Sequence, residues 1–384
     1  MALASTAELG IHSLNSAIND FSSSLYTEFR KNDGNIFYSP LSIQLVLFLT
    51  SIGAKGKTYE EITNTIRLPP RKSELLPLYK DLLSFYEGSE SFTLATGMFV
   101  ENAINLNASY VETAKNYLQS SVEKLNFQTD PNAGRSHIND WFRSHTNGKI
   151  AELFPEGSIN MDTRLVLGNA MYFHGTWTTK FPVNSSAELP FYQTLTDKVN
   201  VTTMRLVHNL RYYKDAGLHF SALALPYQGY SFQMIILLPD AKDGLAELES
   251  NLSKIQLHDL EKNMTFHNVD VTLPKFKIEQ TSELKATLSK MGCPTMFSEN
   301  ADLTDIGPFK ESQLYVSSVV HKANVDVTFE GTEAAAATGL IANTRSFHRK
   351  SIEFPKAVFL ADHPFIFVIT SGKTIMFMGR LKKF

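Results

Sequence analysis

The stretch that decides the fold of this chain reads EGTEAAAATGLIANTRS and occupies residues 330–346. Its four alanines, preceded by a threonine and a glutamate, favour by local propensity a short helix with a capped start. The same residues also fit the two-residue period of a strand, and in that register one face is small, uncharged and free of proline. The members of this face are Thr332, Ala334, Ala336, Thr338, Leu340 and Ala342. The stretch is therefore suited to be an exposed loop in one state and a central strand of a sheet in another.

The first third of the chain has the period of helices instead. Apolar residues recur at helical spacing at Leu14, Ile18, Phe21, Leu25 and Phe29. This stripe predicts an amphipathic helix whose apolar face belongs to the core, and we assign it no site.

Capping signals divide the helices that follow. Ser39 before Pro40 predicts a helix start, because the hydroxyl can cap free N–H groups and proline fits the first helical position. Gly53 is a fitting end for that helix. Thr58, with Glu61 three residues later, predicts a capping box at the start of the next helix.

From the middle onward the apolar runs shorten and become rich in Val, Ile, Phe and Tyr, which is typical of strands. We expect strands at residues 165–173, 232–238, 269–273 and 365–370. A helix is predicted at 282–291, with Gly292 placed to end it. Helices first and many strands later indicate an α+β architecture.

Composition bounds the function classes. The chain has 384 residues, 43% hydrophobic and 20% charged, and contains no linker or repeat that would divide it, so we expect one domain over residues 1–384. A net charge of -3 gives no reason to expect nucleic acid or an anionic membrane as partner. No run is apolar enough for a membrane span. Cys293 is the sole cysteine, which excludes an internal disulfide and a cysteine zinc cluster.

The sequence does not decide in which cell compartment the protein is located. The start MALASTAELG lacks the pattern of a secretory signal, so the chain is either intracellular or already processed. Triplets that could accept an N-linked glycan on a secretory route occur at Asn107, Asn184, Asn200, Asn251 and Asn263.

Enzyme signatures occur only as near misses. GAKGKT at residues 53–58 is similar to a phosphate-binding loop, but Ser51 stands where the first glycine is required and a helix precedes it. SGKT at residues 371–374 fails in the same way and indicates a hairpin turn. The chain has no G-x-S-x-G, H-E-x-x-H or C-x-x-C motif, and its histidines are scattered. We therefore expect no catalytic residues, no metal and no cofactor.

Six motifs in order along the chain resemble the serpin family, in its inhibitory and arthropod-like form. They are NIFYSPLSI at 35–43, LVLGNAMYFHGTW at 165–177, LPKFKIE at 273–279, LYVSSVVHKANVDV at 314–327, EGTEAAAAT at 330–338 and ADHPFIF at 361–367. The resemblance implies an α+β fold of about nine helices around three β-sheets. It also implies an exposed reactive-centre loop over residues 331–350 within the single domain.

The resemblance further assigns roles to single residues. It implies a hinge at the start of the loop, comprising Glu330, Gly331, Thr332, Glu333, Ala334, Ala335, Ala336, Ala337 and Thr338. It implies a polar cluster beneath the central sheet, called the shutter, comprising Asn35, Ser39, Ser42, Asn169 and His321. Trp177 matches the breach, where insertion of the loop begins.

The function implied is suicide inhibition of a protease. Counting from Thr332 as in related inhibitors places the cleaved bond between Arg345 and Ser346, so a trypsin-like protease with an acidic S1 pocket is the expected target. Residues 332–345 would then insert as a strand and hold the protease as an acyl-enzyme. Counting back from ADHPF instead places the bond between Lys350 and Ser351. A further alternative target is a papain-like cysteine protease that recognises the loop around Thr344.

The resemblance also bears on partners and location. We expect a monomer that forms a covalent 1:1 complex with its protease and binds neither nucleic acid nor membrane, while a polysaccharide cofactor is left open. The expected location is extracellular, as a glycoprotein, with the cytoplasm as the alternative. A non-inhibitory carrier, chaperone or storage role is the alternative that keeps the fold, although the small face of the hinge, from Thr332 to Thr338, lacks the bulky, charged or proline residues frequent in such relatives.

Overall fold

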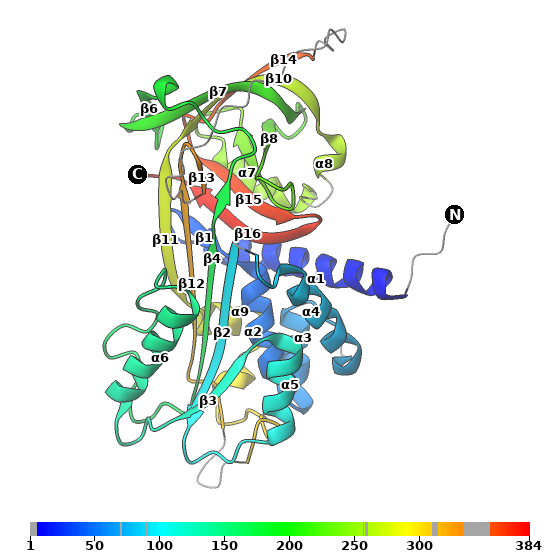
Figure 1. Ribbon diagram of the computed structural model, residues 1–384, viewed down its shortest axis with the longest axis vertical. Helices are drawn as coiled ribbons and strands as arrows, with labels where there is room; N and C mark the ends of the chain where they lie inside the picture. The colour runs from blue at the N-terminus through cyan, green and yellow to red at the C-terminus, as the bar shows by residue number, and fades with distance from the viewer. Residues whose placement is uncertain are drawn as a thin grey trace. The chain divides into compact units, whose positions relative to one another are not determined.

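The computed structural model describes residues 6–69, 71–89, 91–255, 257, 260–308, 314–332 and 354–384 (Figure 1). They divide into two compact units. Unit 1 comprises residues 1–173, 279–324 and 373–378, and unit 2 comprises 174–278, 325–372 and 379–384. The chain passes from one unit to the other within β11 (Phe276–Glu283), β12 (Ser318–Val327) and β16 (Thr374–Leu381), among other points. The expectation of a single domain over residues 1–384 stays a prediction.

Unit 1 holds most of the helices. They are α1 (Thr6–Phe29), α2 (Pro40–Ile52), α3 (Gly56–Thr65), α4 (Lys72–Tyr86), α5 (Ala108–Leu118), α6 (Pro131–His145) and α9 (Lys285–Met291). The predicted stripe of α1 is buried along its whole length, from Leu14 to Phe29. Every residue of α2 is buried, because this helix is apolar around most of its circumference and lies inside the core.

Two of the predicted caps are confirmed and one is wrong. Ser39 accepts a hydrogen bond from the backbone of Ser42 at the start of α2, and Gly53 is the C-cap residue. The capping box at Thr58 is wrong, because α3 begins at Gly56, two residues earlier. Tertiary partners occupy both of its side chains. Thr58 Oγ1 accepts from the Asp302 N–H, and Glu61 accepts from the N–H and the hydroxyl of Thr295.

The sheet of unit 1 has the order β3, β2, β4, β12. β3 (Ser121–Leu125) pairs with β2 (Phe92–Glu101) in parallel, and β2 pairs with β4 (Leu165–Phe173) antiparallel. β4 then pairs in parallel with residues 318–324 of β12. β4 is buried at every position, and its bounds confirm the strand predicted at 165–173. The short strand β1 (Ile36–Tyr38) and the 3-10 helix η3 (Thr295–Phe297) also belong to this unit, as do parts of β11 and β16.

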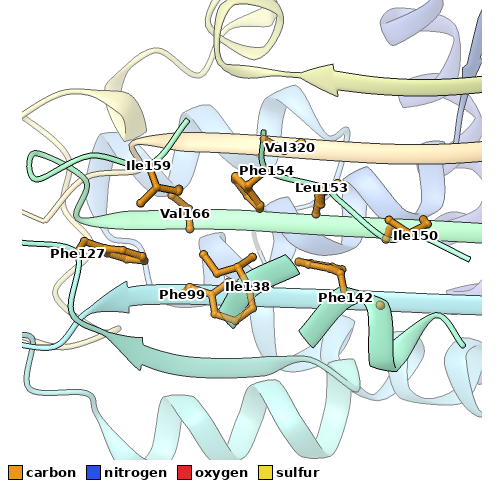
Figure 2. Close-up of a cluster of buried hydrophobic side chains, with 12 residues drawn as sticks. Phe99, Phe127, Ile138, Phe142, Ile150, Leu153, Phe154, Ile159, Val166 and Val320 are labelled. Atoms are coloured by element: carbon orange, nitrogen blue, oxygen red, sulfur yellow. The ribbon is translucent and has the colours of Figure 1, made fainter. Parts of the chain in front are cut away.

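One face of this sheet is covered by α6 and by the segment 146–164 that joins it to β4. Figure 2 shows the apolar cluster between them, in which Phe142 of α6 and Phe154 of the segment lie among side chains of β2, β4 and β12. Gly168 of β4 makes this packing close, because a Cβ at that position would lie 2.5 Å from the Phe142 ring. We call α6 with residues 146–164 the cover.

Unit 2 is mainly β-structure. Its strands are β5 (Gly175–Thr176), β6 (Ala187–Tyr192), β7 (Lys198–Asp215), β8 (Phe220–Pro226), β9 (Gln233–Pro239), β10 (Thr265–Pro274), β13 (Gly331–Thr332), β14 (Lys356–Leu360) and β15 (Phe365–Ser371). Its helices are η1 (Val183–Ser185), α7 (Leu245–Asn251), η2 (Leu252–Lys254) and α8 (Leu260–Asn263). The main sheet has the order β15, β9, β8, β7, β10, β14, with β6 also paired to β7. Residues 198–203 of β7 pair with β6, residues 203–212 with β10 and residues 211–215 with β8, so this long strand joins three neighbours into one sheet.

The α+β fold class is confirmed, with nine α-helices and mixed sheets among the described residues. The strands predicted at 232–238, 269–273 and 365–370 correspond to β9, β10 and β15. The helix predicted from residue 282 begins only at Lys285, because β11 continues to Glu283 with alternating exposure. Residues 371–374 form the predicted turn between β15 and β16, with Gly372 at φ +53°.

Candidate functional site

Two of the expected shutter residues, Asn169 and His321, lie in one row across three strands of unit 1. Thr96 of β2 is opposite Asn169 of β4, and Asn169 is opposite His321 of β12. The Nδ2 group of Asn169 donates to Thr96 Oγ1 at 2.9 Å, and the Oδ1 atom of Asn169 lies 2.9 Å from His321 Nδ1. All three side chains are buried. The row therefore joins β2, β4 and β12 through side chains as well as through backbone hydrogen bonds.

The imidazole of His321 is neutral in this arrangement. The backbone N–H of Ser39 donates to its Nε2 atom at 3.1 Å, so the proton must be on Nδ1 and is donated to Asn169. Burial lowers the pKa of His321 to about 3, because no water is available to solvate the cation. A second proton would break the hydrogen bond from Ser39.

The N-terminal end of α2 completes the cluster. Ser39 Oγ accepts from the N–H of Ser42, and Ser42 Oγ donates back to the Ser39 carbonyl. Asn35, the fifth expected member, is half-buried directly before β1. Ser39, Ser42, Asn169 and His321 are thus joined by hydrogen bonds, and Thr96 is a neighbour that the sequence did not point to.

In unit 2, Trp177, the expected breach residue, contacts the start of the expected hinge. Its Nε1–H donates to the Thr328 carbonyl at 3.0 Å, and its backbone N–H donates to the Glu330 carbonyl at 2.9 Å. The indole stacks on Tyr227 with ring centroids 4.4 Å apart. A hydrogen bond of 2.6 Å then joins the Tyr227 hydroxyl to Thr332 Oγ1, and burial raises the pKa of Tyr227. The hinge therefore begins in a fixed, buried position.

Backbone pairing also fixes the position of Thr332, the residue that Tyr227 contacts. Thr332 of β13 is opposite Val327 of β12 on one side and Gly175 of β5 on the other, and its side chain is fully buried. Gly331 has φ +156° and packs against β5 so closely that a Cβ would lie 1.9 Å from the Gly175 carbonyl oxygen. Only glycine fits this approach. Glu330 forms an ion pair with Lys180. We call residues 330–332 with β5, Trp177 and Tyr227 the hinge anchor.

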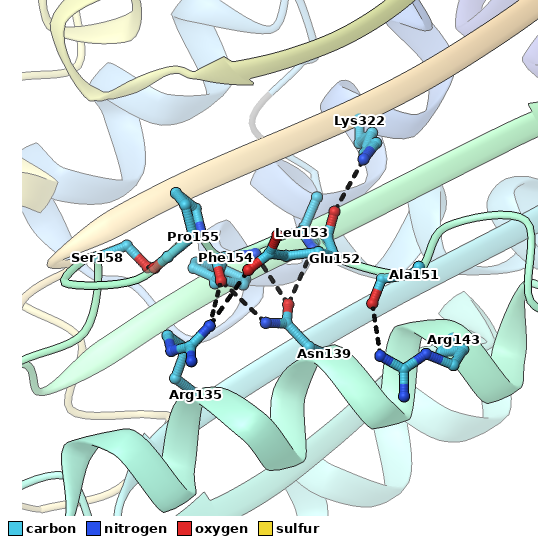
Figure 3. Close-up of polar contacts among 10 residues, drawn as sticks. All are labelled: Arg135, Asn139, Arg143, Ala151, Glu152, Leu153, Phe154, Pro155, Ser158 and Lys322. Carbon is cyan, nitrogen blue, oxygen red and sulfur yellow. Dashed lines mark hydrogen bonds and ion pairs between the residues drawn. The ribbon is translucent and has the colours of Figure 1, made fainter.

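The cover is fastened by polar contacts beside its apolar cluster (Figure 3). The Oδ1 atom of Asn139 accepts from the N–H groups of Leu153 and Phe154, and its Nδ2 group donates to the Phe154 carbonyl, each at 2.9 Å. Lys322 of β12 donates to the Glu152 carbonyl at 2.9 Å. Asn139 thus fixes the segment to α6, and Lys322 ties the same segment to the strand beneath it.

β4 and β12 pair directly with each other, so the sheet of unit 1 has no inserted strand at this position. Residues 166–172 and 318–324 are neighbours in one continuous register, so no other strand lies between them. A strand that entered here would have to separate this register, break the Asn169–His321 hydrogen bond and displace the cover.

The rest of the predicted site lies outside the described residues. This applies to Glu333, Ala334, Ala335, Ala336, Ala337 and Thr338 of the hinge, to Arg345 and Ser346, and to the alternatives Thr344, Lys350 and Ser351. Among the residues that are described, no three His, Cys, Asp or Glu side chains are placed to hold a metal ion. In the same part of the chain, no helix combines the length and apolar character needed to cross a bilayer.

Sequence reasoning missed Thr96, Tyr227 and Asn139. The first two are joined to the site by strand register and by ring stacking, neither of which a single sequence displays. Asn139 was missed because no helix was predicted around it, although a polar side chain on the inner face of a helix needs buried partners.

Comparison with known proteins gives the family and the fold. A family profile described as Serpin (serine protease inhibitor) matches residues 16–383. Human Serpin B4 is 35% identical over 96% of this chain and 99% of its own length. Leukocyte elastase inhibitor of Xenopus laevis is 33% identical over 96% and 99%. The crystal structure of Serpin48, a highly specific serpin of the insect Tenebrio molitor, is similar with a TM-score of 0.86 at 31% identity, covering 97% of this chain and 98% of that one.

Proposed function

Because the chain belongs to the serpin family, we propose that it is a suicide-substrate inhibitor of trypsin-like serine proteases that is cleaved between Arg345 and Ser346. Residues 332–345 then insert between β4 and β12, and the protease stays bound as an acyl-enzyme. The observation that carries the proposal is the hinge anchor. Thr332 is already buried and paired with β12 and β5, so the strand to be inserted has its first residue in place.

The chemistry starts as ordinary proteolysis. The protease serine attacks the Arg345 carbonyl, the bond to the Ser346 nitrogen breaks, and that nitrogen leaves as an amine with the proton taken from the serine. The product is an ester between the serine and the Arg345 acyl group. Water would hydrolyse this ester in a normal cycle. Inhibition requires insertion to be faster, so that the protease is displaced and distorted before water attacks.

The fold supplies a driving force for insertion. A new strand between β4 and β12 gains two ladders of backbone hydrogen bonds in place of one, and its small inward face is buried. Fourteen residues of strand extend over about 46 Å, which is enough to carry a tethered protease along the sheet. The resting state is then a kinetically held state, with the shutter row and the cover as its barriers.

A gel after mixing with trypsin tests the proposal. We expect a band at the summed mass of both proteins that survives boiling in detergent, and a new amino terminus at Ser346. Arg345→Ala should abolish this band without loss of folding, because an exposed loop side chain contributes little to stability. A new amino terminus at Ser351 would move the reactive bond to Lys350. A band formed with a papain-like protease and not with trypsin would favour the cysteine-protease alternative, read around Thr344.

For the surroundings of the protein we propose a secreted monomer in a 1:1 covalent complex with its protease, with the cytoplasm as the alternative location and a polysaccharide cofactor left open. Four of the five glycan acceptor triplets support a glycoprotein, since their asparagines are exposed at Asn107, Asn184, Asn200 and Asn263. Asn251 is half-buried and donates to the Glu247 carbonyl. Mass spectrometry of protein secreted from insect cells tests both points.

A cavity in unit 2 favours the carrier role as a second candidate. Its volume is about 400 Å³, and its walls include Leu206, Arg211, Phe232, Glu261, Phe266 and Thr370. Burial raises the pKa of Glu261, while Arg211 acts against this shift. The buried hydroxyl of Thr370 has no hydrogen-bond partner among the described residues, so a ligand atom could satisfy it. An amphipathic aromatic anion fits these walls.

The carrier role can be tested separately from inhibition. The probe is 8-anilinonaphthalene-1-sulfonate, whose fluorescence rises on binding in an apolar cavity. Arg211→Ala should weaken its binding, while Arg345→Ala should leave it unchanged. Equal binding by wild type and Arg211→Ala would remove the support for this role.

A further inference from the structure

The sheet formed by β7, β10 and β14 has an unusual outer face. Register places Val207 and Val358 on either side of Asp270, and Arg205 and Leu360 on either side of Thr272. Paired residues point to the same side of a sheet, so these side chains share one face. Val358 is 73% exposed, Val207 53% and Leu360 44%. We call Val207, Val358 and Leu360 the outer apolar strip.

These apolar side chains are exposed although the opposite face of the same strands is well buried. The alternate residues of the same strands form the inner face and are buried, including Leu206 of β7, Val269 and Val271 of β10, and Phe359 of β14. An antiparallel or mixed sheet with one covered face usually carries polar side chains on the other. Apolar side chains gathered on the open face of a soluble protein indicate a contact site.

The charges on this face are arranged to leave the strip apolar. Arg205 binds Asp270 through two hydrogen bonds, of 2.8 Å from Nε and 2.7 Å from a terminal nitrogen. The hydrogen bond from Arg205 holds the pKa of Asp270 below its usual range, so the carboxylate is ionised and neutralised by its partner. The two valines flank this neutral pair at a separation of about 10 Å, two strand spacings.

The face lies at the point where the reactive-centre loop returns to the sheet. The N–H of Asn268 in β10 donates to the Pro355 carbonyl at 2.8 Å, and the Phe354 and Phe266 rings lie 6.0 Å apart. Pro355 follows Arg345 by ten residues. Ten residues extend over at most about 35 Å, which is shorter than the width of a protease domain of ordinary size. A protease bound at Arg345 is therefore held within reach of the strip.

We propose that the outer apolar strip is a second contact site for the protease that the loop captures. The fitting partner is a trypsin-like protease with an apolar surface patch beside its active-site cleft. This inference rests on the proposed function and adds selectivity to it. The loop binds proteases that have an acidic S1 pocket. The outer apolar strip then increases the association rate for those among them that carry a matching apolar patch.

The test replaces valine by threonine, which keeps the shape and the strand preference while adding a hydroxyl group. The variants are Val358→Thr and the double change Val207→Thr with Val358→Thr. The matched control is Val183→Thr, because Val183 is 64% exposed but lies in η1, outside the strip. Association rate constants are measured with trypsin, thrombin and plasmin, together with the number of inhibitor molecules used per protease trapped.

We expect the double variant to lose about fivefold or more in rate with the protease that the wild type inhibits fastest, roughly 1 kcal/mol. Val183→Thr should stay within about twofold, the range of ordinary surface changes. The number of inhibitor molecules used per trapped protease should not change, because insertion occurs after binding. Equal rates for the double variant and the control, with every protease, would overturn the inference while leaving the proposed function intact. Absence of a covalent complex with wild type would overturn both.

Discussion

At the scale of single residues, His321 makes the stability of unit 1 depend on pH. Burial lowers the pKa of His321 in the fold to about 3, while an unfolded histidine titrates near its ordinary value of about 6.5. The unfolded chain therefore binds the proton more readily between these two values. Stability contributed by the neutral imidazole is present above pH 6.5 and is lost as the pH falls, by up to about 1.4 kcal/mol per pH unit.

This effect can be measured by urea unfolding of the wild type and of His321→Gln between pH 7.5 and pH 5. The variant should be less stable at pH 7.5, because the Ser39 N–H and Asn169 Oδ1 lose their shared partner. The difference between the two proteins should shrink as the pH falls, since only the wild type pays the cost of protonation. A difference that stays constant over this range would show that His321 does not titrate on unfolding as described.

Gly331 gives a second prediction at this scale. In Gly331→Ala the new Cβ would meet the backbone of Gly175 and Thr176, which cannot rotate away as a side chain can. We expect the pairing of β13 to open and the free energy of unfolding to fall by about 2 kcal/mol or more. Trp177 emission should shift to longer wavelength, because its stacking partner Tyr227 is held by Thr332.

The control for Gly331→Ala is Gly217→Ala. A Cβ at Gly217 would approach nothing closer than 3.4 Å, so this change should be nearly neutral. Similar losses in both variants would mean that the close approach to β5 does not hold the hinge anchor.

At the scale of elements, Asn139 decides how firmly the cover is held. Asn139→Ala removes three hydrogen bonds to backbone groups of Leu153 and Phe154. The two N–H groups stay buried without these partners, while the Phe154 carbonyl keeps a hydrogen bond of 3.3 Å from Arg135. We expect a loss of about 2–4 kcal/mol in stability. Amide hydrogen exchange should become faster in residues 146–159, which separates opening of the cover from general unfolding.

Asp140→Ala is the matched control for Asn139→Ala. Asp140 is exposed at the next position of α6 and forms a surface ion pair with Arg143, so its loss should cost less than about 1 kcal/mol. If Asp140→Ala and Asn139→Ala accelerated exchange equally, the polar fastening of the cover would not depend on Asn139.

The hinge provides a prediction about strand alternation. Thr332 is buried, so Ala334 falls on the same inward face of the inserted strand and Glu333 on the outward face. Ala334→Asp should bury an unpaired charge, slow insertion and turn the inhibitor into a substrate that is cleaved and releases active protease. Glu333→Arg should leave most of the detergent-stable complex. Both variants are compared by densitometry of cleaved and complexed inhibitor, and equal damage would contradict the inserted-strand mechanism.

Many elements were predictable from the sequence, and the exceptions have physical causes. The strand at 165–173 and the helix start at Ser39 depend on local signals, namely a β-rich apolar run and a capping residue before proline. The capping box predicted at Thr58 and Glu61 was wrong, because both side chains form hydrogen bonds with residues distant in the sequence. Of the site, the family motifs pointed to His321, Asn169 and Trp177. Thr96 and Tyr227 could not be found in this way, because their contacts depend on register between strands distant in the sequence.

At the scale of the whole molecule, cleavage should make the protein more stable. In the resting state β4 pairs directly with β12, and insertion of the cleaved loop would add one more central strand to that sheet. We expect the midpoint of thermal unfolding to rise by about 20 °C or more after limited cleavage in the loop, because new hydrogen-bond ladders and burial are gained without loss of the core. Calorimetry before and after such cleavage measures this. A lower or unchanged midpoint would contradict a kinetically held resting state.

The pairing of Gly331 and Thr332 in β13 has a consequence for the timing of inhibition. In crystal growth, a seed removes the lag that a solution otherwise spends waiting for a first nucleus. On the proposed mechanism β13 is such a seed for the inserted strand, since Thr332 is already paired with β12 and β5 before any protease arrives. Insertion is then growth from an existing edge, one residue after another. The time needed to trap a protease should therefore increase smoothly with the number of residues between Thr332 and the cleaved bond.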